Sequence, residues 1–206
     1  MKIIALKQRR HRLTAVYFEN CGEAETIDSE TLLMSGFHEG SDISEDDWQE
    51  LKGEAQRNRA YEKALYLLEY RAHTKKELFT KLRAVFPADV CEHALSRIEQ
   101  LGLCDDEAFA KDFAEELFKR KGFGKRRVAF ELSKKGVDRD IIDSVLCEYE
   151  DEDPVESIVR VIEKKYCPLP EDEKKYQRIY AGLARMGYGY GDIKTALLRV
   201  KNGEYF

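Results

Sequence analysis

The stretch that decides the fold reads KRRVAFELSKKGVDRDIIDSVL and spans residues 125–146. Val128 and Leu132 lie four residues apart, as on one face of a helix, and Gly136 marks a turn before the next apolar pattern. The same arrangement recurs about fifty residues earlier and about fifty residues later. The three apolar pairs are Leu78 with Leu82, Val128 with Leu132, and Ile179 with Leu183. A repeat of this length predicts a stack of helical units rather than one globular core.

The N-terminal part of the chain follows a different pattern. Residues 1–28 contain short apolar or alternating runs separated by turn residues, which predicts three short β-strands. Because so small a sheet is not stable alone in water, we expect it to pack on a neighbouring helix. Two separate helices are expected after it. One begins at Ser44 and carries Trp48 and Leu51, and the other carries an apolar stripe from Tyr61 to Leu68.

We therefore predict a mostly α fold. It is an elongated array of three tandem three-helix repeats, preceded by a small N-terminal antiparallel β segment. The expected boundaries are 1–52 for the β segment with its short helices, 53–103 for repeat 1, 104–151 for repeat 2 and 152–206 for repeat 3. A unit of about fifty residues buries little surface, so neighbouring repeats should share apolar surface, or the acidic and basic blocks should help to align them. The relative angles of the repeats are expected to be adjustable.

Composition narrows the class of protein. Of the 206 residues, 43% are hydrophobic and 36% are charged, and there is no apolar run long enough to cross a membrane. The N-terminus lacks the order of a signal peptide, because basic residues follow its apolar run. The five cysteines are widely spaced and contain no CxxC pair, which favours free thiols. These features predict a cytoplasmic protein.

Motifs for catalysis or cofactor binding are not found in the sequence. The Gly122–Lys125 segment resembles a phosphate loop but lacks the first glycine and the Ser/Thr after the lysine. The four histidines lack metal-ligand spacing, and neither a nucleophile motif nor an isolated carboxylate pair is present. We therefore expect no enzyme, no catalytic residue, no metal and no cofactor.

The net charge of −5 conceals three separate charged blocks. Residues 2–12 hold five Lys/Arg and no acid. Residues 119–139 hold nine Lys/Arg and two acids, and residues 140–153 hold seven acids and no Lys/Arg. Such segregation suggests a charged partner, although solvated helix faces are the commoner explanation of any single run.

The second block supplies the candidate contact residues for a partner or for DNA. Basic side chains there suit phosphates or carboxylates. Phe123 lies between glycines and is expected to be exposed, whereas Phe130 and Tyr188 are expected to pack inside. The predicted contact residues are Arg120, Lys121, Phe123, Lys125, Arg126, Arg127, Lys134 and Lys135.

Several segments give the chain a family resemblance. Residues 101–110, LGLCDDEAFA, and the helix pair in residues 123–138 are similar to the RecX family, which regulates the RecA recombinase of bacteria. Tyr61–Leu65 and Thr74–Leu78 resemble the first repeat of that family. The resemblance covers nearly the whole chain and is most specific over residues 60–146.

The resemblance implies a regulator that is not an enzyme, that binds RecA filaments on DNA and that inhibits their ATPase, strand-exchange and co-protease activities. Capping of the filament end and occupation of the filament groove remain alternative mechanisms. Weak binding to single- or double-stranded DNA is compatible with this function, and a monomer without membrane attachment is expected. Two other functions stay open, a direct nucleic-acid-binding helical module and a protein–protein adaptor.

Overall fold

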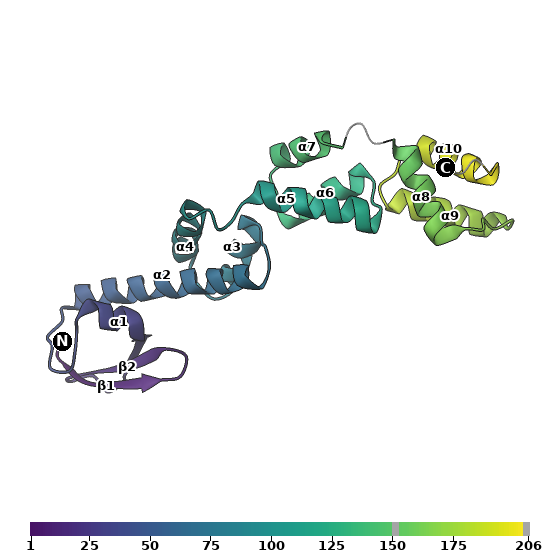
Figure 1. Cartoon of the computed structure of the whole chain (residues 1–206). Helices are drawn as coiled ribbons and strands as arrows, with labels where there is room; N and C mark the ends of the chain where they lie inside the picture. The colour runs from purple at the N-terminus through teal and green to yellow at the C-terminus, as the bar shows by residue number, and fades with distance from the viewer. Residues whose placement is uncertain (150–152, 204–206) are drawn as a thin grey trace. The chain divides into compact units, whose positions relative to one another are not determined.

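The computed structural model describes residues 1–149 and 153–203 and is mostly helical (Figure 1). The chain divides into two compact units, Met1–Cys104 and Asp105–Phe206. The first unit contains the sheet and repeat 1, and the second contains repeats 2 and 3. In the part of the chain that the structure describes, no helix is long and apolar enough to cross a membrane.

The predicted β segment is present as a three-stranded antiparallel sheet. Its strands are β1 (Ile3–Arg9), β2 (Leu13–Phe18) and β3 (Glu25–Asp28), in the order β1-β2-β3. Helix α1 (Ser29–Ser35) follows β3 directly. The Asp28 carboxylate accepts hydrogen bonds from the first backbone N–H groups of α1, and Gly36 ends the helix with a φ of 76°.

The next helix, α2 (Glu45–Tyr70), is continuous over 26 residues. The prediction of two separate helices here is therefore wrong, and the proposed boundary between residues 52 and 53 falls inside α2. Gly53 is the only glycine in the stretch and no proline interrupts it, so nothing local ends the helix. The first half of α2 covers the sheet, where Trp48 meets the Phe18 ring edge-on at 4.9 Å.

The second half of α2 forms repeat 1 with α3 (Lys75–Arg83) and α4 (Ala88–Gln100). Ala60 and Ala64 of α2 are buried against the predicted pair Leu78 and Leu82. One helix thus belongs to two cores, that of the sheet and that of repeat 1. This sharing supplies the helix that the small sheet needs for stability.

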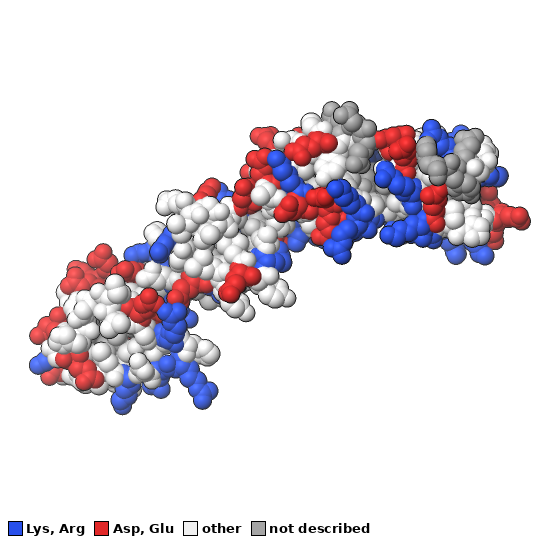
Figure 2. Space-filling model, viewed as in Figure 1, with Lys and Arg blue, Asp and Glu red and all other residues white. Residues whose placement is uncertain are grey.

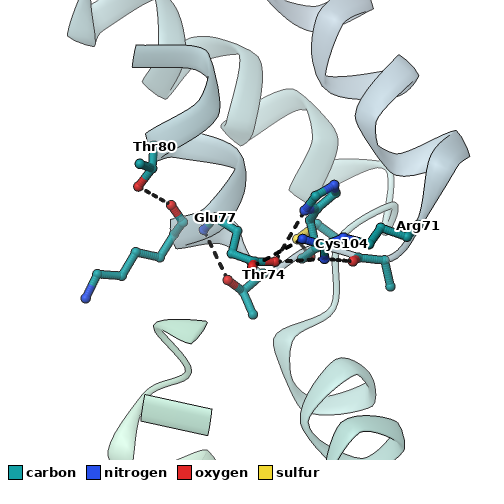
Figure 3. A network of polar contacts seen from close by, with 8 residues as sticks. Arg71, Thr74, Glu77, Thr80 and Cys104 are labelled. Carbon is teal, nitrogen blue, oxygen red and sulfur yellow. Dashed lines mark hydrogen bonds and ion pairs between the residues drawn. The ribbon is translucent and has the colours of Figure 1, made fainter. Parts of the chain in front are cut away.

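A network of polar contacts fixes the start of α3 (Figure 3). The Thr74 hydroxyl accepts from the Glu77 backbone N–H at 3.1 Å, as the capping-box spacing predicts, and Arg71 donates to the Glu77 carboxylate at 3.0 Å. His73 Nδ1 lies 3.3 Å from the same carboxylate. The Cys104 thiol donates to the His73 carbonyl, which ties the end of the unit to the α3 cap.

This network predicts a dependence of stability on pH. Burial lowers the pKa of His73 from its ordinary value of 6.5, and the Arg71 charge adds to this effect against the opposing Glu77 carboxylate. The folded state therefore binds the proton less tightly than the unfolded state does. The contribution of His73 to stability is complete above pH 6.5 and is lost as the pH falls below that value through the folded pKa.

We expect His73→Gln, which cannot titrate, to reduce the loss of unfolding free energy between about pH 7.5 and about pH 5.5. Urea unfolding followed by the fluorescence of Trp48, the single tryptophan of the chain, measures this loss for the first unit. His93→Gln is the matched control, because His93 is exposed. An equal loss in both variants would contradict the prediction.

The second unit contains the other two repeats. Repeat 2 consists of α5 (Asp106–Glu115), the π-helix η1 (Glu116–Lys121), α6 (Lys125–Lys135) and α7 (Arg139–Cys147). Repeat 3 consists of α8 (Pro154–Tyr166), α9 (Glu173–Arg185) and α10 (Tyr190–Lys201). The apolar pairs of both repeats are buried as predicted. The fold class, a mostly helical chain with three tandem three-helix repeats after a small antiparallel sheet, is confirmed.

Candidate binding surface at the junction of repeats 2 and 3

Two glycine-containing loops hold repeats 2 and 3 together. The loop before α6 contains Gly122 and Gly124, and the loop before α10 contains Gly187 and Tyr188. The Gly124 backbone N–H donates to the Met186 carbonyl at 2.8 Å, and the Tyr188 hydroxyl donates to the Gly122 carbonyl at 3.0 Å. The two repeats therefore meet through one backbone–backbone and one side chain–backbone hydrogen bond.

This close approach depends on the absence of side chains. A Cβ at Gly124 would lie 2.8 Å from the Gly187 carbonyl oxygen, and a Cβ at Gly187 would lie 2.5 Å from the Arg127 backbone nitrogen. Gly187 also has a φ of 94°, which favours glycine. At this junction the backbones of the two loops come into direct contact, and the expectation of adjustable angles between repeats stays a prediction.

The junction creates a groove of about 240 Å³ with a basic lining. Arg120 and Lys121 reach it from η1, and Phe123 reaches it from the following loop. Helix α8 supplies the opposite side with Arg160, Lys164 and Lys165. We call these six residues the basic groove. Figure 2 shows Lys and Arg side chains gathered where the two repeats meet.

Most of the cations of the basic groove have no carboxylate partner among the residues that the structure describes. Lys121 lies 3.8 Å from Glu116, at the limit of an ion pair. Within residues 1–149 and 153–203, no ion pair involves Arg120, Arg160, Lys164 or Lys165. Positive charge concentrated in one concave surface attracts anionic groups and raises the rate of their association. The groove is thus suited to phosphates or carboxylates of a partner.

A second hollow of about 700 Å³ lies beside the basic groove. Phe123 contributes to both, and Lys125 and Arg126 line the second one from the start of α6. Tyr188 and Tyr190 lie on its repeat 3 side. Tyr188 is buried, as expected from the sequence, whereas Tyr190 is 76% exposed. The structure therefore brings five predicted contact residues, from Arg120 to Arg126, to one junction.

Arg127 has a different environment from its neighbours. Its guanidinium lies over the rings of Phe123 and Phe130, at 5.7 and 5.3 Å, and pairs with Glu131 at 2.6 Å. Phe123 is only half-buried, which leaves part of its ring accessible. Arg127 is thus held by contacts within the protein, which makes it the least available of the predicted contact residues.

The expected packing of Phe130 in the core is wrong, because its side chain is 57% exposed. Phe130 follows the buried Val128 by two residues, which is a rotation of about 200° around the helix. Lys134 and Lys135 lie at the far end of α6, and Lys135 sits 5.8 Å from the Phe113 ring centre. These two lysines do not line either hollow at the junction.

Sequence reasoning missed Arg160, Lys164 and Lys165. Lys164 and Lys165 follow Arg160 by four and five residues, which places the three side chains on adjacent parts of one helix surface. This spacing could have indicated them from the sequence. The sequence could not show that this surface faces η1. The arrangement depends on how two loops dock that lie more than 60 residues apart in the sequence.

Together, three tandem three-helix repeats, a small N-terminal sheet and a cation-lined junction define a helical repeat protein with a basic surface. Family models for RecX match all three repeats. The first three-helix domain matches residues 60–97, the second residues 105–146 and the third residues 151–197. The chain belongs to the RecX family of regulatory proteins.

Individual relatives support this assignment. The chain is 35% identical to regulatory protein RecX of Chlorobium phaeobacteroides over 141 residues, which cover 68% of this chain and 91% of the relative. It is 31% identical to regulatory protein RecX of Caldanaerobacter subterraneus over 84% of this chain and 87% of that one.

Solved structures show the same fold. The crystal structure of RecX from Lactobacillus salivarius has a TM-score of 0.61 and 27% identity, over 71% of this chain and 97% of that one. A crystal structure of regulatory protein RecX has a TM-score of 0.68 at 20% identity and covers 95% of this chain and 98% of that chain.

The predicted boundaries between the β segment and the repeats, after residues 52, 103 and 151, stay a prediction.

Proposed function

We propose that this protein binds RecA nucleoprotein filaments on DNA and inhibits their ATPase, strand-exchange and co-protease activities. Membership of a family of regulatory proteins supports a regulatory role. The observation that carries the proposal is the basic groove, which two repeats build jointly beside the hydrogen-bonded glycine loops. A filament on DNA offers anionic groups at regular intervals along its length.

A row of small helical units suits a repetitive partner. Each repeat has its own core, so each can present a separate contact surface. Modest contacts by several units of one chain add up to a high overall affinity when all units reach the same polymer. We propose the predicted residues of the junction, with Arg160, Lys164 and Lys165, as one such contact.

A RecA ATPase assay on single-stranded DNA tests the proposal. We expect this protein to lower the steady-state rate of ATP hydrolysis with increasing concentration, at constant salt. The same assay started from preformed filaments, together with electron microscopy, separates blocking of filament growth from changes within existing filaments. Unchanged hydrolysis and unchanged filaments at micromolar protein would rule out the proposed function.

Direct binding to nucleic acid is the second candidate, because the unpaired cations of the basic groove suit phosphates equally well. Titration with labelled single- and double-stranded DNA in the absence of RecA distinguishes the two functions. Tight binding that falls steeply with salt, without inhibition of RecA, favours a nucleic-acid-binding module. Weak binding together with inhibition favours the filament regulator.

A further inference from the structure

The first unit contains a groove that the proposed function does not use. It lies between strand β1 and helix α1 and has a volume of about 840 Å³. Leu6 and Phe37, both half-buried, form apolar parts of its lining. Leu33 and Met34 of α1 also line it, and they are 78% and 80% exposed. We call this the N-terminal groove.

The groove follows from the topology of the sheet. Helix α1 starts directly after β3 and packs against β2 and β3, whereas β1 is the strand farthest from β3. Because α1 ends after seven residues at Gly36, it does not reach across to β1. The inner face near Leu6 therefore stays accessible, and the exposed side of α1 forms the other wall.

The groove has a basic border on its hairpin side, and Glu30 is the acidic residue in its lining. Arg9 and Arg12 line it, and Lys7 and Arg10 are exposed on the same hairpin. Arg12 is held by ion pairs to Glu30 and Glu62, so it belongs to the wall of the groove. The block of residues 2–12 contains five Lys/Arg and no acid. Figure 2 shows basic side chains along this edge of the sheet, next to uncharged surface.

We propose that the N-terminal groove binds an amphipathic helix of a partner protein that carries acidic residues along one edge. Its apolar side chains would pack on Leu33, Met34 and Phe37, and its carboxylates would face Arg9 and Arg10. An apolar groove receives the apolar face of a helix, and charges on the rim set its orientation and rate of association. Burial of the two exposed side chains of α1 supplies the affinity.

The basic border of the N-terminal groove favours an acidic helix over a second copy of the chain or a nucleic acid. A second copy of the chain would bring two basic blocks, each formed by residues 2–12, close together, and this repulsion opposes self-association. Nucleic acid complements the cations but leaves Leu33 and Met34 exposed to water, since it has no apolar side chains to place on them. An acidic amphipathic helix satisfies the apolar walls and the basic border at once. The proposal is independent of the basic groove and of RecA.

The test uses the full chain and a fluorescent synthetic peptide of about 18 residues, long enough for a stable helix when bound. Its leucines follow helical spacing and glutamates flank them. We expect saturable binding by fluorescence anisotropy. Leu33→Ser with Met34→Ser should weaken this binding about tenfold or more. Ile4→Ser is the matched control and should bind normally, because Ile4 is 56% exposed on β1 but does not line the groove.

Further variants and binding measurements distinguish the acidic helix from the other possible occupants of the N-terminal groove. Arg9→Glu with Arg10→Glu should weaken binding of the glutamate peptide and strengthen binding of a version with lysines, whereas Arg59→Glu on α2 should change neither. No saturable binding, equal binding of both peptides, or no effect of the Leu33 and Met34 changes would overturn the proposal. Binding to anionic vesicles, or Met34-dependent self-association, without peptide binding would overturn it in favour of a lipid surface or a second copy.

Discussion

Gly187→Ala should lower the unfolding free energy of the Asp105–Phe206 unit by about 2 to 4 kcal/mol. Two effects add. The φ of 94° is unfavourable for any residue with a Cβ, and that Cβ would lie 2.5 Å from the backbone nitrogen of Arg127. Backbone atoms cannot rotate away as a flexible side chain can, so the two loops must separate.

Hydrogen exchange of the Gly124 amide reports this separation directly. Its N–H donates to the Met186 carbonyl across the junction, so the exchange rate of this amide should rise strongly in Gly187→Ala. Amides within the buried stretches of α6 and α9 should change only with the global stability. Thermal unfolding followed by circular dichroism gives the free energy change for the unit.

Gly191→Ala is the matched control for this prediction. Gly191 lies in α10 close to Gly187, and a Cβ there would meet no atom within 4 Å. Alanine is the better helix former, so the same substitution should stabilise the unit slightly, by about 0.5 to 1 kcal/mol. If Gly187→Ala were as stable as Gly191→Ala, the close contact between the repeats would not exist in solution.

The repeats themselves could be predicted because their information is local. Leu78 with Leu82 and Val128 with Leu132 mark buried helix faces by their spacing alone, and all four side chains are fully buried. The same rule, applied more strictly, places Phe130 on the opposite side from Val128, so that error was avoidable. The continuity of α2 could also be predicted, since its middle contains one glycine and no proline.

The junction could not be predicted in this way. In the sequence, Gly122 and Gly124 resemble an ordinary helix connection, and so do Gly187 and Gly189. Only the structure shows that the two loops pack closely against each other. The sequence therefore indicated the cations of repeat 2, but not Arg160, Lys164 and Lys165, which line the same groove from α8. Which helix surfaces face each other depends on contacts far apart in the chain, and hydrophobic spacing carries no information about them.

Charge reversal in the basic groove should have the largest effect on the proposed activity. Arg120→Glu, Arg160→Glu and Lys164→Glu together should raise the concentration needed for half-inhibition of RecA ATPase by about tenfold to a hundredfold. This estimate takes about 0.5 to 1 kcal/mol for each exposed charge contact. All three side chains are exposed and form no ion pair among the described residues, so the fold should be unaffected.

Arg127 is left out of this variant for a structural reason. Its guanidinium pairs with Glu131 and packs between Phe123 and Phe130, so its reversal would disturb the junction itself. A loss of inhibition could then come either from the reversed charge or from the disturbed junction. The matched control is Lys174→Glu, Lys194→Glu and Lys201→Glu, which changes the net charge equally at exposed sites that line neither hollow.

The control variant separates a local contact from a general charge effect. If long-range attraction alone brings the protein to the filament, both triple variants should lose inhibition equally, and added salt should remove the difference from the unmodified protein. If the basic groove makes the contact, only its own variant should lose inhibition at a fixed salt concentration. Normal inhibition by the groove variant would move the functional surface away from the basic groove, for example to the first unit. Adding Lys125→Glu and Arg126→Glu then determines whether the second hollow contributes, because these two residues lie on the same junction but outside the basic groove.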